Sequence, residues 1–198
     1  SEGIELSLVS DAVLDQMADT VTPQGIVAVC QFLSQDLATV LARGARHIVV
    51  LHEVKDPGNV GNIMRTADAA GADAVVVTAE SVDVYNPKVV RASTGSIFHI
   101  PLVHRADLVH AIADIQAAGL VVYAADAGGR DLVSLRDEGS LAKPLAWLLG
   151  NEAHGLSAEA ESVADQVVAV PLYGQAESLS LPTAAAICLY EAAFAQRA

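Results

Sequence analysis

The chain has 198 residues, of which 53% are hydrophobic and 18% are charged, a composition that is typical of a folded globular protein and excludes a disordered one. Its formal net charge of −13 argues against a strong attraction to nucleic acid over the whole sequence. No apolar run approaches the roughly 20 residues that span a bilayer, and no basic-then-apolar leader is present, so we expect a cytoplasmic protein without a membrane segment.

The charge is distributed unevenly along the sequence. Residues 43–105 hold seven Lys and Arg against six Asp and Glu, whereas the rest of the chain holds four basic and 18 acidic residues. An anionic partner is therefore expected to contact the middle third of the sequence, where the charge does not repel it.

The cysteines and histidines indicate no metal site. Cys30 and Cys188 lie far apart in apolar surroundings and are expected to be reduced thiols of the core. The six histidines are scattered, and no pair of Cys or His residues has the spacing of zinc ligands. We therefore expect a protein without a metal.

Residues 1–25 are acidic and show little strand pattern. Within them, the segment 9–20 (VSDAVLDQMADT) predicts a short amphipathic helix, because Val13, Leu14 and Met17 share one face. The turn sequence TPQG then ends this helix. The segment is expected to be a tail or a linker and not a domain of its own.

From residue 25 onward, short β-branched runs alternate with helical patterns. The runs are GIVAVC (25–30), HIVVLHEV (47–54), AVVVT (74–78), LVVYAAD (120–126), LAWLLG (145–150) and QVVAVPL (166–172). The clearest helical stretches are 62–72, 86–96, 106–119 and 182–197. Runs that are apolar on both faces fit a parallel sheet covered by helices, so the predicted fold class is α/β, a mostly parallel sheet with helices on both faces.

Ligands of such sheets bind beyond the carboxyl ends of the strands, and three loops there carry unusual residues. The first is DPGNVGN (56–62), in which Asn62 is expected to cap the following helix and to place Arg65 in its first turn. An Arg is unfavourable near the positive end of a helix dipole unless an anion is held there. The alternative is a capped helix with a solvated Arg. The Walker and GxGxxG patterns of two common nucleotide-binding loops are absent.

The second loop is GNEAHGLS, which directly follows the apolar run WLL. Glu152 lies here at the end of a strand between Gly150 and Gly155, so the backbone is expected to turn tightly around something. The alternative is an ordinary turn in which Glu152 or Ser157 caps a helix.

The third loop is VPLYGQAESLSLPTAAA (170–186), with Ser178 and Ser180 just before a helix that starts with Pro182. The ordinary role of such serines is N-capping, which Ser180 is well placed to perform.

Each loop by itself is ambiguous, but the three motifs in this order make a specific match. With N-x-x-R after DPGN, LGNEAHGL after a strand, and ESL before the last helix, the chain resembles the SpoU (TrmH-type) family of RNA 2′-O-ribose methyltransferases of the SPOUT class. The resemblance covers about residues 45–198 and extends to NPKVVRASTGSIFHIPL between the first two motifs.

The resemblance implies a fold, a cofactor and partners. The family fold is an α/β sheet with a deep C-terminal trefoil knot, an exception to the rule that chains are unknotted. It implies S-adenosyl-L-methionine as cofactor, RNA as substrate (ribosomal RNA favoured over transfer RNA) and a homodimer. It implies that residues 1–30 are a linker or the remnant of an N-terminal RNA-binding domain, and that 31–198 form the catalytic domain. The residues that match cofactor contacts are Gly150, Val170, Leu179, Ala124 and Asn151.

The resemblance also implies catalytic residues for transfer of a methyl group to a ribose 2′-hydroxyl. It gives the central role to Arg65, with Asn62 placing it. Because the pKa of an Arg lies above about 12, Arg65 is a poor base, and we expect it to hold a phosphate and orient the hydroxyl. Glu152 is expected to form a bidentate pair with Arg65, and Ser178 to hydrogen-bond the sugar.

Two further points concern the RNA and a departure from the family pattern. Lys88 and Arg91 are candidates for RNA phosphate contacts, with a solvated basic helix face as the alternative. Where the family commonly has Asn, this chain has Ser180, which has one donor fewer and puts the rate in doubt more than the reaction class.

Two other functions were weighed against the methyltransferase. The alternative is a module that binds S-adenosylmethionine and RNA with weak or no catalytic activity, which the change at Ser180 would permit. A third reading, an α/β enzyme that binds a small nucleotide, is disfavoured by the missing Walker lysine. The sequence does not name the RNA or the nucleotide that is modified.

Overall fold

The computed structural model describes residue 3, residues 5–18 and residues 20–198. The chain divides into two compact units, Ser1–Phe32 and Leu33–Ala198. The described part of the first unit contains the helix α1 (Asp11–Met17), inside the segment where the sequence predicts one; residue 19 of that segment lies outside the described residues.

The predicted strand at 25–30 is wrong. These residues have no regular secondary structure, and the side chain of Val29 is 97% exposed. A strand needs a neighbouring strand to pair its backbone N–H and C=O groups, and no strand of the described residues pairs with this segment. An apolar run alone therefore gave a false signal.

The second unit is built on a six-stranded sheet in the order β3-β2-β1-β5-β4-β6, and all of its strand pairs are parallel. The strands are β1 (His47–Leu51), β2 (Ala74–Thr78), β3 (Leu102–Ala106), β4 (Val121–Asp131), β5 (Leu145–Leu149) and β6 (Gln166–Ala169). The predicted α/β class with a parallel sheet is confirmed. Strand β3 was not predicted because this edge strand, LVHRA, is half exposed and has no continuous apolar run.

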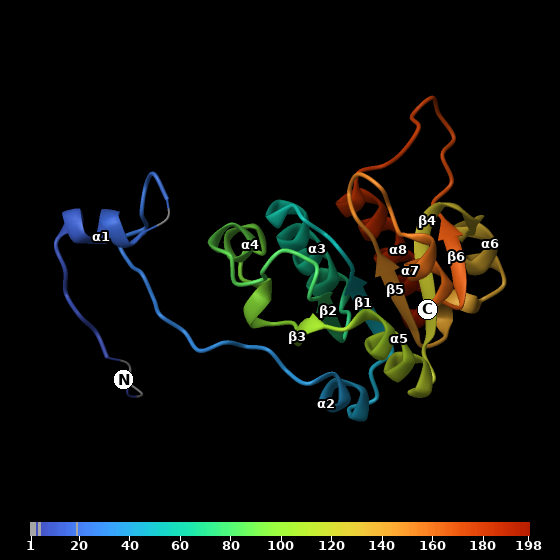
Figure 1. Cartoon of the computed structure of the whole chain (residues 1–198), viewed down its shortest axis with the longest axis horizontal. Helices are drawn as coiled ribbons and strands as arrows, with labels where there is room; N and C mark the ends of the chain where they lie inside the picture. The colour runs from blue at the N-terminus through green and yellow to red at the C-terminus, as the bar shows by residue number, and fades with distance from the viewer. Residues whose placement is uncertain (1–2, 4, 19) are drawn as a thin grey trace. The chain divides into compact units, whose positions relative to one another are not determined.

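Helices cover both faces of the sheet (Figure 1). One core contains Val49, Leu51 and Trp147 with the helices α3 (Pro57–Ala70) and α8 (Leu181–Arg197). The other contains Ile48 and Val50 with α2 (Leu37–Ala42), α5 (Leu108–Ala117) and α7 (Ala158–Ser162). Successive residues of a strand point to opposite faces, so a strand covered on both sides must be apolar throughout. The remaining helices are α4 (Pro87–Ala92), α6 (Leu132–Asp137), η1 (Ser96–Phe98) and η2 (Ser140–Ala142).

Helix α3 begins five residues earlier than the sequence predicts. Asp56 is its N-cap and accepts a hydrogen bond from the backbone N–H of Asn59 at 2.8 Å, and Pro57 occupies the first helical position. The prediction that Asn62 caps this helix is therefore wrong, and Arg65 lies in the third turn and not in the first. The acid-proline pair at 56–57 is the start signal that was overlooked.

The deep knot implied by the family resemblance stays a prediction, because the order of the strands does not test how the chain is threaded. None of the helices in the described part of the chain has both the length and the apolar character to cross a membrane.

His47 is a buried titratable group at the amino end of β1. Neither of its ring nitrogens has a hydrogen-bond partner, and burial lowers its pKa to about 4, against an opposing effect of Asp73 and a further lowering by Arg197. The ring is therefore neutral in the fold at pH 7, whereas in the unfolded chain it takes up a proton below its usual pKa.

This difference predicts a loss of stability in acid. As the pH falls from about 6.5 to about 4, the unfolded state binds a proton that the folded state does not, so the free energy of unfolding decreases by about 3 kcal/mol. Replacing His47 by Leu removes this term. Urea unfolding at pH 7 and pH 4.5 measures it, and the prediction is contradicted if the variant loses as much stability as the wild type over this range.

Candidate functional site

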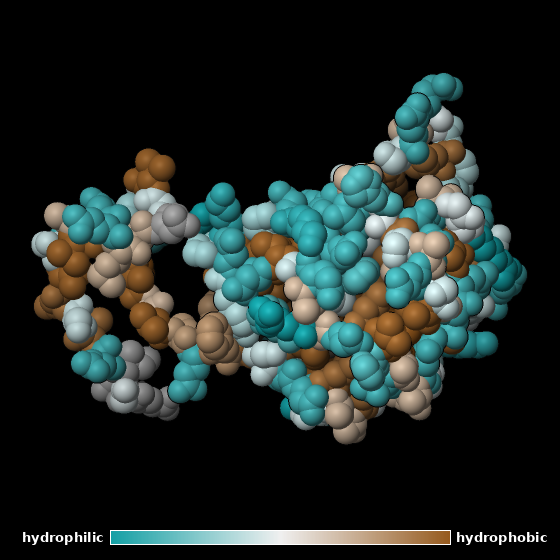
Figure 2. Space-filling view, viewed as in Figure 1, coloured by the Kyte–Doolittle hydropathy of each residue, from teal (hydrophilic) through white to brown (hydrophobic). Residues whose placement is uncertain are grey.

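A cavity of about 320 Å³ lies at the carboxyl ends of β4, β5 and β6. It is lined by residues 125–127 of β4, by residues 151–155 after β5, and by Val168 of β6 and Val170 after it. The last loop and α8 add Leu172, Glu177, Ser178, Leu179, Leu181 and Ala184. Such an edge is where ligands bind in parallel α/β sheets. The loop 171–180 projects beyond the sheet there, and its tip is hydrophilic (Figures 1 and 2).

The turn after β5 forms one wall of the cavity and is tightly closed. The backbones of Asn151 and Gly155 donate to each other's carbonyl oxygens at 2.9 and 3.0 Å. Gly155 has a φ of 68°, and a Cβ on it would lie 2.4 Å from Oδ2 of Asp126. A Cβ on Gly150 would lie 2.5 Å from the carbonyl oxygen of Gly155. Only glycine fits at these two positions, as a backbone shaped around a ligand requires.

Asn151 joins this turn to the loop after β1. Its side-chain Oδ1 accepts from the backbone N–H of Ala153 at 2.8 Å, and its Nδ2 donates to the carbonyl oxygen of Glu53 at 3.0 Å. Glu53 has a φ of 55°, a conformation that is uncommon for a residue with a side chain. Both ends of the amide are therefore used to hold two loops in place.

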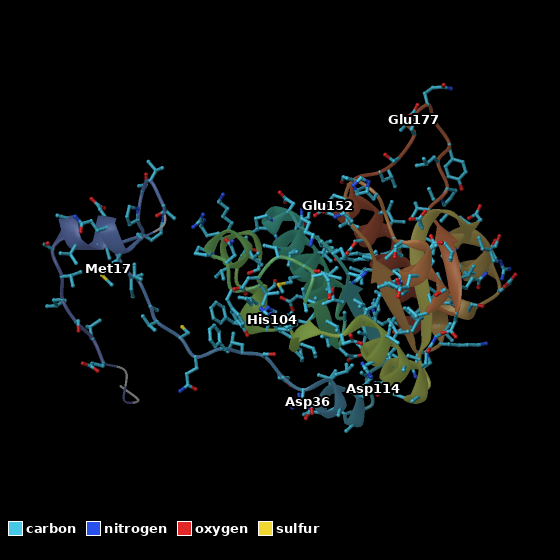
Figure 3. The ribbon with its side chains drawn as sticks, viewed as in Figure 1. Met17, Asp36, His104, Asp114, Glu152 and Glu177 are labelled. Atoms are coloured by element: carbon cyan, nitrogen blue, oxygen red, sulfur yellow. The ribbon has the colours of Figure 1, made fainter. Side chains whose placement is uncertain are left out.

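Glu152 makes a second connection between the same loops (Figure 3). Its carboxylate accepts from the backbone N–H of Asp56 at 2.9 Å, from that of Lys55 at 3.2 Å, and from the side-chain Nδ2 of Asn59 at 3.1 Å. Partial burial raises the pKa of Glu152, but these hydrogen bonds and one from its own N–H lower it more, so the pKa lies below its usual value.

The expected pair between Glu152 and Arg65 is not among the ion pairs of the described residues, and both carboxylate oxygens have the partners named above. Arg65 and Asn62 are exposed on α3 and do not line the cavity. The difference follows from the early start of α3, which brings Asn59 to Glu152 and moves Arg65 two turns away. Asn59 was missed; its place in DPGN after a strand is the signal that could have found it.

Most of the predicted cofactor residues lie at the cavity, and one does not. Val170, Leu179 and Asn151 line the cavity together with Ser178 and Glu152. Gly150 shapes its wall through the close approach of the turn. Ala124 differs, because it is fully buried in the second core and does not line the cavity; its neighbours 125–127 do.

Three further predicted residues do not line the cavity: two lie on α4, and one caps α8. Lys88 and Arg91 are exposed on α4, whose N-cap Asn86 accepts from the backbone N–H of Lys88 at 2.9 Å. Ser180 is the N-cap of α8, as expected by position, but its hydroxyl hydrogen-bonds the hydroxyl of Thr183 at 2.7 Å and no backbone N–H. Over the part of the chain that the structure describes, no group of His, Cys, Asp and Glu could hold a metal ion.

Comparison with known proteins shows the family of the chain. The model of the SpoU rRNA Methylase family matches residues 46–190, which include the whole cavity wall. The chain belongs to the SpoU family. A second model, described as RNA 2′-O ribose methyltransferase substrate binding, matches residues 1–35.

Several known methyltransferases resemble the chain over most of its length. The 23S rRNA (guanosine(2553)-2′-O)-methyltransferase RlmP of Bacillus subtilis is 40% identical over 95% of this chain and 72% of its own. The SpoU methyltransferase AviRb of Streptomyces viridochromogenes in complex with AdoMet has a TM-score of 0.71 at 36% identity, over 83% of this chain and 65% of that one. An AdoMet-bound rRNA methyltransferase of Sinorhizobium meliloti has a TM-score of 0.80 at 32% identity, over 92% and 69%.

The first site prediction concerns the carboxylate of Glu152. In Glu152→Gln, the amide leaves one acceptor oxygen for three donors, so we expect the free energy of unfolding at pH 7 to fall by about 1 kcal/mol. Because the folded pKa is lowered, the difference from the wild type is present above the usual pKa and disappears as the pH falls through the folded value. Urea titrations at pH 7 and pH 3 measure it; an equal difference at both pH values contradicts the assignment.

The second site prediction concerns the closed turn. In Gly155→Ala, the new methyl group meets Asp126 and the backbone keeps a positive φ, so we expect a loss of about 1–3 kcal/mol in stability and weaker ligand binding. Gly174→Ala in the projecting loop is the matched control, because its Cβ meets nothing within 4 Å. Thermal unfolding of the two variants compares them, and equal midpoints would contradict the role of the turn.

Proposed function

We propose that this SpoU chain transfers a methyl group from S-adenosylmethionine to a ribose 2′-hydroxyl of ribosomal RNA in the cytoplasm. The observation that carries the proposal is the cavity at the ends of β4, β5 and β6, in a chain that belongs to the SpoU family. Ribosomal RNA is favoured because the relatives RlmP of Bacillus subtilis and the methyltransferase of Streptomyces viridochromogenes are both named for 23S rRNA.

The cavity suits the proposed cofactor. Its volume of about 320 Å³ lies within the range of roughly 300–1,000 Å³ for small-molecule sites. Its lining includes the apolar residues Val168, Val170, Leu179 and Leu181, which fit an adenosyl group. It also includes carboxylates, which fit a cation. When bound, S-adenosylmethionine supplies an electrophilic methyl group on a positively charged sulfur.

The chain's own residues have to bring a poor nucleophile into position. An alcohol reacts only when it is oriented or deprotonated, and an arginine side chain is a poor base. We propose that Arg65 binds a phosphate of the RNA and orients the 2′-hydroxyl, with Asn62 beside it on the exposed face of α3. Ser178 hydrogen-bonds the sugar. Glu152 positions Asn59 and the amino end of α3 through the three hydrogen bonds that it accepts.

RNA contacts are proposed on the middle third of the sequence. Lys88 and Arg91 on α4 are exposed and lie in the segment 43–105, where basic residues outnumber acidic ones. Residues 1–30 are proposed to be a linker or the end of an RNA-binding domain, which the match of the substrate-binding model to residues 1–35 supports.

A homodimer is part of the proposal. Tyr190 and Phe194 form an aromatic pair on α8 with ring centroids 5.6 Å apart, and they are 37% and 66% exposed. Exposed aromatic side chains next to an alanine-rich helix face suit a contact between two copies.

The alternative, a module that binds cofactor and RNA with weak or no activity, has one supporting observation. The hydroxyl of Ser180 is turned to Thr183 of its own helix, so it offers less to a substrate than a free amide would.

The proposed role of Arg65 gives a test that separates the two functions. In Arg65→Ala, we expect transfer of labelled methyl groups from S-adenosylmethionine to ribosomal RNA to fall by about 100-fold or more, since orientation of the hydroxyl is lost. Affinity for S-adenosylhomocysteine, measured by titration calorimetry, should stay unchanged because Arg65 does not line the cavity.

The control is Lys143→Ala, because Lys143 is an exposed basic residue that lies outside the segment 43–105 and does not line the cavity. It should keep full activity. Equal loss of transfer and of cofactor affinity in Arg65→Ala would refute the role assigned to Arg65, and a wild-type chain that binds cofactor but transfers nothing would support the alternative.

A further inference from the structure

The cavity lining has an unusual balance of charge. Three carboxylates line it, from Asp126, Glu152 and Glu177, and no Lys or Arg of the described residues does. They come from β4, from the turn after β5 and from the loop before α8, and Figure 3 shows Glu152 and Glu177 at this edge of the molecule. A carboxylate-lined cavity attracts cations, and the attraction grows where water is partly excluded.

Asp126 is held in this lining by an irregularity in β4. Ala125 and Arg130 both pair with Val168 of β6, so the four residues between them bulge out of the strand. The bulge closes against β6, where a Cβ on Gly129 would lie 2.4 Å from the backbone nitrogen of Val168. Bulges re-aim side chains beside functional sites, and this one presents Asp126 to the cavity.

The carboxylate of Asp126 has capacity left for a ligand. Its Oδ2 accepts from the backbone N–H of Leu156 at a long 3.3 Å, and within residues 20–198 its Oδ1 has no hydrogen-bond partner. The side chain is half-buried. By contrast, both oxygens of Glu152 are used by Lys55, Asp56 and Asn59. Asp126 is thus the half-buried anion of the lining that is free to face a cation.

The proposed reaction changes the charge of the cofactor. The bond between sulfur and the methyl carbon breaks with its electron pair staying on sulfur, the ribose oxygen gains the methyl group, and the hydroxyl proton leaves to solvent. S-adenosylmethionine carries a sulfonium and an ammonium against one carboxylate, whereas S-adenosylhomocysteine has lost the sulfonium charge. A fixed anion in the cavity therefore stabilises the donor more than the product.

We propose that Asp126 is a specificity-determining residue that makes the cavity prefer the cationic methyl donor over the neutral product. This inference rests on the proposed function. The same preference favours dissociation of the product, because the attraction to Asp126 weakens once the methyl group has been transferred.

The test is calorimetric titration of the 198-residue chain with three probes at low salt: S-adenosylmethionine, S-adenosylhomocysteine, and sinefungin, in which an amine-bearing carbon replaces the sulfonium. In Asp126→Asn, which keeps an acceptor for Leu156, we expect affinity for S-adenosylmethionine and sinefungin to fall about tenfold. Affinity for S-adenosylhomocysteine should change less than about threefold. Added salt should weaken donor binding to the wild type more than to the variant.

Glu159→Gln is the matched control for net charge, because Glu159 is exposed on α7 and does not line the cavity; it should leave all three affinities unchanged. An unchanged ratio of the affinities for donor and product in Asp126→Asn would overturn the inference. If both affinities fall equally, Asp126 is a structural residue. A wild-type chain that binds none of the probes would overturn the proposed function itself.

Discussion

The geometry of the site depends on one carboxylate that accepts hydrogen bonds from the start of another loop. Glu152, after β5, holds the backbone of Lys55 and Asp56 and the amide of Asn59, and thereby joins two neighbouring strands at their carboxyl ends. The distance along the chain is almost 100 residues, but β1 and β5 are adjacent in the sheet. The parallel order brings the loops together, and the carboxylate fixes how they meet.

The rest of the cavity wall follows from how closely backbones approach each other. Asn151 holds the carbonyl group of Glu53, while Gly150 and Gly155 let the turn fold flat against Asp126. Neither interaction involves a long or mobile side chain. This part of the wall is held by contacts within the protein, which limits the ordering cost of binding there.

Much of the fold was predictable from the sequence because a strand covered on both faces is mostly apolar, and β1, β2 and β5 are mostly apolar and buried at every position. The motifs at the strand ends were predictable for the same reason. The half-exposed edge strand β3 was not predictable in this way, since it lacks a continuous apolar run. The early start of α3 was not predicted, because the N-cap Asp56 was overlooked. The consequence was that Asn62 was predicted as the helix cap, that Asn59 was missed, and that Glu152 was expected to pair with Arg65, which is not among its hydrogen-bond partners. The strand predicted at 25–30 was wrong because an apolar run does not indicate whether a partner strand exists.

The bulge in β4 separates the pairing of the sheet from the choice of side chains that line the cavity. The ladder with β6 resumes on the same residue, Val168, on both sides of the bulge, so the pairing of the two strands does not depend on which side chains occupy positions 127 and 128. Asp126 is fixed by its contacts with Leu156 and Gly155, and Gly129 by its approach to the neighbouring backbone. Ala127 lines the cavity, so a different side chain there can change ligand preference while the sheet beneath stays the same.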